Sequence, residues 1–194
     1  MSATPLRLAV INSSVREGRF GPTVARWFVE QATQRPDLEV DLIDLNEHAL
    51  PHELSHAPSE TVSAELARVS PRLAAAEAFV VVTPEYNHSY PASLKNLIDW
   101  HRTEWQAKPL GFVSYGGLAG GLRSVEHLRP VFAELHAVTV RDCVSFHNVW
   151  GQFDEAGALV EPTAAGTASK TLLDQLVWWG VSLREAREKR PYTA

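Results

Sequence analysis

Cysteine is almost absent from this 194-residue chain, in which Cys143 is the only one. A single cysteine excludes an intramolecular disulfide framework and a CxxC metal or redox motif. Cys143 falls in a predicted strand, so we interpret it as a small buried hydrophobic side chain. No apolar run approaches the roughly 20 residues that span a membrane, and the first residues contain too short an apolar stretch for a secretion signal. We therefore expect a cytoplasmic protein that does not enter a membrane.

An excess of positive charge is missing as well. Lysine and arginine number 18 against 23 acidic residues, which gives a net charge of −5. Nucleic-acid surfaces normally carry a basic stripe, so we expect no nucleic-acid partner, although a local pocket can still hold an anion. Apolar residues make up 45% of the chain and charged residues 21%, enough to bury a full core. We expect residues 1–194 to form a single domain.

Several familiar site motifs are also absent. No Gly-Lys-Ser/Thr follows the first predicted strand, which excludes a Walker phosphate loop, and the dinucleotide fingerprint GxGxxG is missing. Without that fingerprint we interpret Asp44 as a surface carboxylate rather than a ribose ligand. The segment FVSYG around Ser114 lacks the first glycine of a serine-hydrolase elbow.

A metal site is not expected either. His48, His52 and His56 are spaced by four residues, as helical metal ligands would be. Pro51 interrupts any such helix, and no cysteine or ordered set of carboxylates completes a site. We interpret this histidine-rich segment as a mobile loop over the active site.

Apolar runs typical of strands alternate along the chain with runs of helical period. We predict strands at residues 6–11, 38–45, 79–83, 110–115 and 138–146, and helices at 22–34, 60–76, 92–105, 119–136 and 168–188. Pro130 lies inside the fourth helix, which we expect to be kinked or divided there. The alternation predicts an α/β fold whose parallel sheet is covered on both faces, because parallel strands need crossover helices. Ligands of such sheets bind beyond the carboxyl ends of the strands.

The first loop, residues 13–27, has the composition of a phosphate cradle. Glycines permit tight turns, proline suits the first helical position, and the free amides of a helix start favour an anion. Hydroxyl groups and fixed positive charges complete the set, which consists of Ser14, Arg16, Gly18, Arg19, Gly21, Pro22 and Thr23. The alternative is an ordinary strand-to-helix turn with solvated arginines.

Two further loops have unusual compositions. The third loop, residues 84–91, runs from Pro84 to Pro91 and contains Glu85, Tyr86 and Asn87, so it presents a flat apolar wall with a few polar anchors. The fourth loop, residues 114–124, contains Gly116 and Gly117, which let the backbone approach a flat group and donate hydrogen bonds to it. Each loop alone has a plain alternative as a covering turn. Together with the first loop, they predict a mononucleotide whose ring is a flavin.

The segment TPEYNHSYPASLKNLIDW resembles the pattern TPEYN-x-S-x-P-x-x-LKN-x-IDW of the NADPH-dependent FMN reductase family. SSVREGRFGP is similar to the phosphate loop G-S-x-R-x-G of that family, and SYGGLAGG to its flavin loop S-x-G-G-x-x-G-G. The likeness extends from the first strand to about His136 and weakens after Cys143. Ser13 stands where the family usually has glycine.

The resemblance implies a flavodoxin-like three-layer sandwich with strand order 2-1-3-4-5. It also implies an FMN-dependent NAD(P)H oxidoreductase that passes hydride through flavin N5 to free flavin, quinone, azo compounds or similar small acceptors, with no catalytic side chain. FMN is the implied cofactor and NAD(P)H the co-substrate, and the enzyme is implied to be a homodimer or homotetramer. The implied FMN contacts are Ser14, Arg16, Phe20, Gly21, Pro22, Thr23, Pro84, Glu85, Tyr86, Asn87, Ser114, Tyr115, Gly116 and Gly117. Arg19 joins this set as a second candidate cation.

Two other functions stay open on the sequence alone. A flavodoxin-type electron carrier would bind FMN but oxidise NAD(P)H poorly, and a flavin-binding sensor would have no turnover. An interface is indicated by Trp100, which points away from the predicted apolar stripe of its helix. Trp178 likewise lies off the stripe formed by Leu172, Leu176, Trp179 and Leu183. Burial of these aromatic side chains beneath loops is the alternative.

Overall fold

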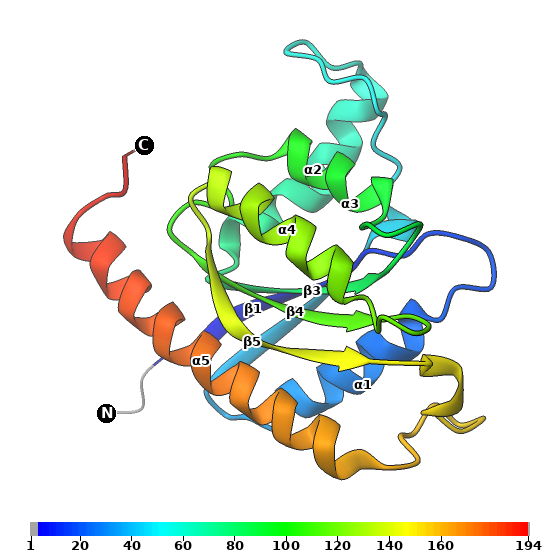
Figure 1. Cartoon of the computed structure of the whole chain (residues 1–194). Coiled ribbons are helices and arrows are strands. Elements are labelled where there is room, and N and C mark those ends of the chain that lie inside the picture. Colours follow the sequence, from blue (N-terminus) through cyan, green and yellow to red (C-terminus); the bar gives the residue numbers. More distant parts are fainter. Residues whose placement is uncertain (1–3, 194) are drawn as a thin grey trace.

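The computed structural model describes residues 4–193 as an α/β sandwich with one five-stranded parallel sheet (Figure 1). The strands are β1 (Leu6–Asn12), β2 (Leu38–Asp44), β3 (Ala78–Pro84), β4 (Pro109–Tyr115) and β5 (Val138–Phe146), in the order β2-β1-β3-β4-β5. The helices are α1 (Gly21–Thr33), α2 (Glu60–Ala75), α3 (Ala92–Trp100), α4 (Leu122–Glu134) and α5 (Pro162–Lys189), with short 3₁₀ turns η1 (Leu45–Glu47) and η2 (Val149–Gly151). The predicted fold class and strand order are confirmed.

The helices cover both faces of the sheet, α1 and α5 on one side and α2, α3 and α4 on the other (Figure 1). Alternate residues of each strand face opposite layers, so Leu8 and Val10 pack toward α1 and α5 while Ile11 packs toward the other three helices. β3 and β4 are buried along their whole length, as the run of three valines in β3 predicts.

The register of the strands brings their carboxyl ends to one edge. Asn12 at the end of β1 pairs with Asp44 of β2 and with Val82 of β3. Tyr115 at the end of β4 pairs with Pro84 of β3 and with Phe146 of β5. The first, third and fourth loops therefore leave the sheet side by side, which is the arrangement that the candidate site requires.

Two helix ends differ from the prediction. α3 ends at Trp100 rather than at residue 105, because His101 turns to an extended backbone and its Nδ1 lies 2.8 Å from the carbonyl oxygen of Leu97. Trp105 is nevertheless fully buried beside Phe79, so its apolar signal came from the core and not from a helix. α5 begins at Pro162, six residues earlier than predicted, with proline in the first turn.

The prediction for α4 was also partly wrong. Its first residues, 119–121, form a turn, and the helix begins at Leu122. The helix continues through Pro130 to Glu134 as one element, so it is not divided there.

The predicted apolar stripe of α5 was wrong at one position. Trp179 is 38% exposed, and Gly180 takes the inner position, where an added Cβ would come within 2.5 Å of Leu6. Trp178 is 63% exposed, as its place off the stripe indicated, and it packs edge to face on Trp179. Trp100 is half-buried and donates its indole N–H to the carbonyl oxygen of Pro51, at 2.8 Å.

Lys108 makes the stability depend on pH. Burial, with Arg187 nearby, lowers the pKa of Lys108 from 10.5 to about 8, and its Nζ donates to the carbonyl oxygens of Leu73 and Ala74 at the end of α2. Between about pH 8 and 10.5 the unfolded chain binds more protons at this group, so the free energy of unfolding rises with pH there. Below pH 8 Lys108 is charged in both the folded and the unfolded state, and the folded state bears the full cost of burying that charge.

We expect Lys108→Met to lack this rise. Between pH 8 and 10.5 the free energy of unfolding of the wild type should increase by up to about 3 kcal/mol more than that of the variant. Denaturant titrations at half-unit pH steps measure this difference. Parallel curves for the two proteins would show that Lys108 keeps its ordinary pKa, and Lys95→Met, at an exposed ion pair with Asp99, is the control.

Candidate functional site

The first loop is fastened to the neighbouring strand and helix by Ser13. Its backbone N–H and its Oγ both donate to the carbonyl oxygen of Val82, at 3.0 and 2.9 Å. Its own carbonyl oxygen accepts from Ser93 Oγ of α3 at 2.7 Å. Ser13, which stands where the family pattern has glycine, therefore anchors the loop. The loop keeps a fixed place over the sheet.

The loop ends at Gly21, where only glycine fits. A Cβ built on Gly21 would overlap Ser14 Oγ and Asn12 Oδ1 and would lie 2.8 Å from the Tyr115 hydroxyl oxygen. Ser14 Oγ donates to Asn12 Oδ1 at 3.2 Å, and both residues are fully buried. Three polar atoms from two strands and a loop thus converge beneath the first residue of α1.

The start of α1 suits an anion. Its N-cap residue, Phe20, makes no side-chain capping bond, and no acidic residue lies in the first turn. Pro22 stands at the beginning of the helix and Thr23 follows with its hydroxyl. Thr23 and Val24 donate their N–H groups to the Phe20 carbonyl oxygen, so the Gly21 N–H and the positive end of the helix dipole favour a phosphate group at this place.

The structure assigns different roles to the two arginines of the loop. Arg19 forms a bidentate ion pair with Asp44, with Nη2 2.9 Å from Oδ2, and its Nη1 also donates to the carbonyl oxygen of Ser14 at 2.7 Å. Arg16 is exposed and its guanidinium lies 5.5 Å from the centre of the Tyr86 ring. No carboxylate among residues 4–193 forms an ion pair with Arg16. Arg16 is therefore the free cation of the loop, and Arg19, predicted as a ligand, braces the backbone.

Asp44 is more important to the loop than the sequence indicated. Its side chain is only 17% exposed and accepts from Asn12 Nδ2, Arg19 and the backbone N–H of Asn46. Burial by itself would raise the pKa of Asp44, but the bonds from Arg19 and Asn46 outweigh it and hold that pKa below its ordinary value. The interpretation as a surface carboxylate was wrong, because an ionised Asp44 ties β1, β2 and the first loop together.

The third loop contains a tight two-residue turn. The backbone N–H of Tyr86 donates to Ser89 at 2.8 Å, and that of Ser89 donates back at 3.1 Å. Asn87 and His88, between them, have φ angles of 49° and 74°. Positive φ at both central residues defines a type I′ turn, a conformation in which asparagine is favoured. The turn holds Tyr86 and Asn87 in a fixed position at the sheet edge.

Tyr86 has a polar atom with no partner. Its hydroxyl group is buried, and no donor or acceptor of the described chain lies within hydrogen-bonding distance. Burial raises the pKa of Tyr86, against the influence of Arg16 and Arg19. A buried hydroxyl without a partner costs about 1–3 kcal/mol unless a ligand or water satisfies it. Its place beside Arg16 suits the polar tail of a phosphorylated ligand.

The third loop is held to α4 by contacts that the sequence did not predict. Glu85 was expected to line a ring, but its carboxylate accepts from Arg123 Nη1 at 2.8 Å and from the Arg123 backbone N–H at 3.3 Å. Ser124 Oγ lies 2.9 Å from the carbonyl oxygen of Pro84 and 2.7 Å from that of Ser89. Arg123 and Ser124 are the last residues of the fourth loop, at the start of α4, so these bonds set its distance from the third loop.

The fourth loop is braced from within. Ser114 Oγ donates to the carbonyl oxygen of Gly120 at 2.8 Å. The Gly116 N–H, predicted as a donor to the ligand, donates instead to Phe146 at 3.1 Å. The Gly117 N–H has no protein partner within the described residues, so it is free to donate to a ligand. Gly121 has φ +81°, and a Cβ there would lie 2.8 Å from the Tyr115 nitrogen, which explains this glycine.

Tyr115 occupies a different place from the one predicted. It was expected beside the pyrimidine edge of a flavin, but it is 4% exposed and belongs to the core on the α1 side. Its hydroxyl lies under Gly21, close to Ser14. Burial strongly raises the pKa of Tyr115, so it stays neutral and serves as the floor of the first loop.

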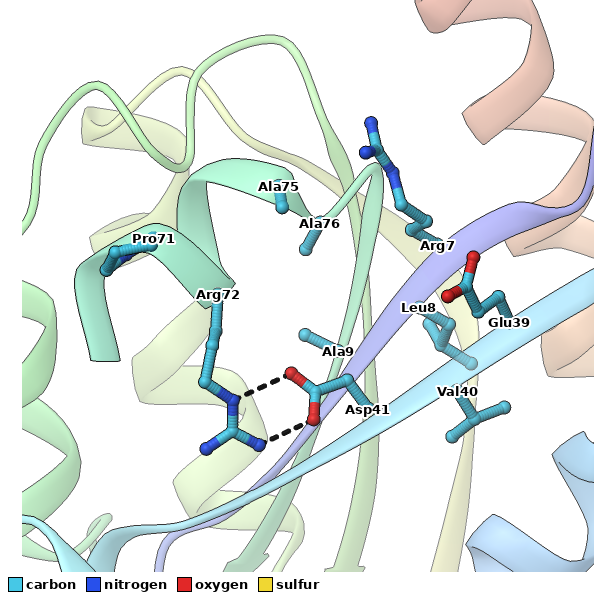
Figure 2. A pocket seen from close by; sticks show the side chains of 10 residues that line it. All are labelled: Arg7, Leu8, Ala9, Glu39, Val40, Asp41, Pro71, Arg72, Ala75 and Ala76. Atoms are coloured by element: carbon cyan, nitrogen blue, oxygen red, sulfur yellow. Dashed lines mark hydrogen bonds and ion pairs between the residues drawn. The ribbon is translucent and has the colours of Figure 1, made fainter. Parts of the chain in front are cut away.

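A separate cavity of about 450 Å³ lies at the opposite end of the sheet (Figure 2). It is bounded by the first halves of β1 and β2 and by the end of α2, where Arg72 Nε donates to Asp41 at 2.8 Å. None of the predicted cofactor ligands lines it. Because ligands of parallel sheets bind at the carboxyl edge, we place the functional site at the three loops instead.

The histidine-rich segment shows no metal site. Within the part of the chain that the structure describes, no three His, Cys, Asp or Glu side chains gather as a metal would require. His48 Nδ1 pairs with Glu65 at 2.7 Å, whereas His52 and His56 are exposed. No helix formed by residues 4–193 has the length and apolar character to cross a membrane.

We expect Glu85→Gln to weaken FMN binding about three- to tenfold. The substitution keeps the shape of the side chain but removes the charge from its bonds to Arg123, so the third and fourth loops are held less firmly. The effect on the free energy of unfolding should stay below about 1 kcal/mol, because Arg123 is partly exposed. Titration of FMN fluorescence measures the affinity. The control is Glu126→Gln, an exposed change on α4, the helix that carries Arg123. It should leave the affinity for FMN unaltered.

A parallel α/β sheet, an uncapped helix start over a polar cradle and two braced loops at one edge define a mononucleotide-binding protein of flavodoxin-like fold.

Comparison with known proteins specifies this class. The family model of NADPH-dependent FMN reductase matches residues 6–151. An NAD(P)H-dependent FMN reductase of Schizosaccharomyces pombe is 37% identical over 128 residues, which are 62% of this chain and 62% of that protein. A probable NADPH:quinone oxidoreductase of Oryza sativa is 30% identical over 169 residues, 83% of this chain and 82% of the relative.

The fold has solved counterparts. The flavoenzyme NAD(P)H:(acceptor) oxidoreductase of Paracoccus denitrificans superposes with a TM-score of 0.71, covering 91% of this chain and 98% of that one at 22% sequence identity. This chain belongs to the NADPH-dependent FMN reductase family. It is accordingly an FMN-dependent oxidoreductase with NAD(P)H as co-substrate.

Proposed function

We propose that the chain reduces small acceptors, among them quinones, free flavin or azo compounds, with FMN held by the three loops at the carboxyl edge. The observation that carries this proposal is the convergence of Asn12, Ser14 and Tyr115 beneath Gly21, next to the unpartnered Tyr86 hydroxyl. Bound FMN supplies the hydride-accepting atom, N5, and every protein group serves to bind and orient.

The first loop holds the phosphate and ribityl chain in this proposal. The Gly21 N–H and the Thr23 hydroxyl donate to the phosphate, and Arg16 supplies the neutralising charge. Phe20, Gly21 and Pro22 form the surface on which the tail lies. Ser14 acts through its bond to Asn12, and Arg19 acts through Asp44, so both position the loop.

The ring is held by the third and fourth loops. Pro84, Tyr86 and Asn87 give an apolar wall with polar edges, and the Gly117 N–H faces the part of the ring where negative charge develops on reduction. Ser114, Gly116 and Glu85 keep these loops in place through their internal bonds. Such rigidity keeps donors in position without reorganisation during the reaction.

The alternative functions are less well supported. An electron carrier of the flavodoxin type would be expected to have a phosphate loop without arginine and a strongly acidic docking face. In that loop of this chain, Arg16 forms no ion pair with any of the residues 4–193, and the net charge of the chain is only −5. Its relatives include named FMN and quinone reductases.

Steady-state kinetics test the proposal. With FMN and menadione present, the purified protein should consume NAD(P)H over many turnovers, and the rate should depend on added or bound FMN. A protein that binds FMN but shows no turnover with menadione, free flavin or an azo dye would overturn the enzymatic proposal in favour of a sensor. A protein that binds FMN but oxidises NAD(P)H only very slowly would instead favour an electron carrier of the flavodoxin type.

Assembly and location stay proposals. The exposed Trp178 and Trp179 on α5, which pack edge to face, support a contact between copies in a homodimer or homotetramer, because large exposed aromatics are enriched at interfaces. The single cysteine supports a reducing compartment, the cytoplasm. Sedimentation velocity of the wild type and Trp178→Ser tests the assembly, since a monomeric wild type would exclude it.

A further inference from the structure

A second cavity, of about 330 Å³, lies behind the first loop. It is bounded by Val15 of that loop, by the segment after β2 and by the first half of α3. Its ten lining residues are Val15, Leu45, Asn46, His48, Leu50, His52, Ala92, Ser93, Asn96 and Leu97. None of them belongs to the set proposed to hold FMN, so this hollow is distinct from the flavin site.

The lining is mixed: Val15, Leu45, Leu50, Ala92 and Leu97 are apolar, and the five other residues are polar. Leu45 and Leu97 are buried, and Leu50 packs against the same core. Ser93 Oγ donates to Ser13, and Asn96 Nδ2 donates to the carbonyl oxygen of Leu50 at 2.7 Å. A ligand in this space therefore meets both apolar surface and polar side chains, of which Ser93 and Asn96 are already engaged.

His48 is the polar residue of this lining that has a buried atom without a partner among the described residues. Its side chain is 3% exposed, and its Nδ1 lies 2.7 Å from Glu65 Oε1. Its other ring nitrogen, Nε2, is buried and has no hydrogen-bond partner in the described part of the chain. An unsatisfied buried group of this kind costs about 1–3 kcal/mol, so a native chain retains it where something binds.

Glu65 sets the chemistry of that nitrogen. Burial alone would raise the pKa of Glu65, but hydrogen bonds from His48 and Arg68 hold it below its ordinary value, so the carboxylate stays ionised. An ionised carboxylate only accepts, so His48 Nδ1 carries a proton, and whenever the ring is neutral its Nε2 presents a lone pair. The nearby negative charge disfavours an anionic ligand.

We propose that this cavity binds a small uncharged molecule with an apolar body and one hydroxyl group, a phenol in the simplest case, which donates its hydrogen bond to His48 Nε2. A metal ion does not fit, because no third ligating side chain accompanies His48 and His52 among the residues described. The neighbouring residues 51–59 are mostly exposed and bury little, so the wall can yield locally as the hydroxyl reaches the nitrogen.

The test compares phenol with anisole, which has the same apolar ring but no proton to donate. Protein labelled with ¹⁵N-histidine and saturated with FMN is titrated with each probe while the Nε2 resonance of His48 is followed. Phenol should shift that resonance saturably and bind about tenfold more tightly than anisole. Flavin fluorescence, recorded separately, reports on the flavin site, so a failure here does not affect the proposed function.

Two variants complete the experiment. His48→Asn keeps a donor toward Glu65 but removes Nε2, so phenol affinity should fall about tenfold to the level of anisole. His52→Asn, at an exposed residue of the same lining, should change it less than about twofold. Equal binding of phenol and anisole, an unshifted Nε2 or no binding at all would overturn the proposal in the wild type, whether or not His48→Asn folds.

Discussion

Gly21→Ala is expected to lower the affinity for FMN by roughly 100-fold. The added methyl group would overlap Ser14 Oγ and Asn12 Oδ1, which are buried and bonded to each other, and it would press on the Tyr115 hydroxyl. These groups have no free space to move into, so the start of α1 must shift away from the sheet. The Gly21 N–H that faces the phosphate shifts with it. Fluorescence titration of FMN measures the loss.

Gly18→Ala is the matched control in the same loop. Gly18 has φ +64°, so alanine is strained there by about 1 kcal/mol, but nothing lies within 4 Å of the added Cβ. FMN affinity should change only a few-fold in this variant. If Gly18→Ala and Gly21→Ala weaken FMN equally, strain in the loop and not the cradle beneath Gly21 controls binding.

Arg16→Ala should weaken FMN binding roughly 10- to 100-fold, because a charge-assisted bond to phosphate is lost. Arg16 has no carboxylate partner among residues 4–193, and its place over Tyr86 leaves the guanidinium free to bind. The unfolding temperature should hardly change, since the side chain is exposed. The difference between wild type and variant should shrink as salt is raised, because screening weakens the Arg16 contact.

Arg19→Ala distinguishes binding from positioning. Arg19 is paired with Asp44 and the backbone of Ser14, so its loss should lower the unfolding temperature and relax the first loop. Asp44→Asn should reproduce this effect, whereas Arg16→Ala should not. If Arg19→Ala instead weakens FMN as much as Arg16→Ala does without any loss of stability, Arg19 contacts the phosphate directly and the assignment of roles is wrong. Arg26→Ala, an exposed change on α1, is the control.

The sheet and the location of the site could be predicted because they depend on local patterns. Buried strands such as β3 and β4 are continuous apolar runs, and parallel strands bring every carboxyl end to the same edge. Residues 84–91 and 114–124 therefore had to lie close to residues 13–27. The TPEYN segment added the type of cofactor through its resemblance to a family.

The direction of each side chain within the site could not be predicted. Arg16 and Arg19 are equivalent by composition, and only the distant Asp44, which β2 brings beside β1, distinguishes them. The Glu85 carboxylate pairs with Arg123 at the start of α4 and so turns away from the site. Contacts of this kind join residues far apart in sequence, so the local spacing of apolar and polar residues does not indicate them.

The predictions for α3 and α5 were partly wrong for a related reason. Trp105 continues the apolar spacing of α3, yet it reaches the core from a turn beyond the helix, where its indole N–H donates to the carbonyl oxygen of His101. In α5, Gly180 packs on Leu6 where Trp179 was expected, because close approach of helix and strand leaves no room for a side chain. Apolar periodicity shows which residues are buried more reliably than which element carries them.

The most direct measurement is a crystal structure of the chain soaked with FMN. Electron density for the phosphate should lie at the start of α1 beside Arg16, and density for the ring should lie between residues 84–87 and the Gly117 amide. Density for the ring in the hollow between α2 and the first halves of β1 and β2 (Figure 2), or none at the three loops, would contradict the account.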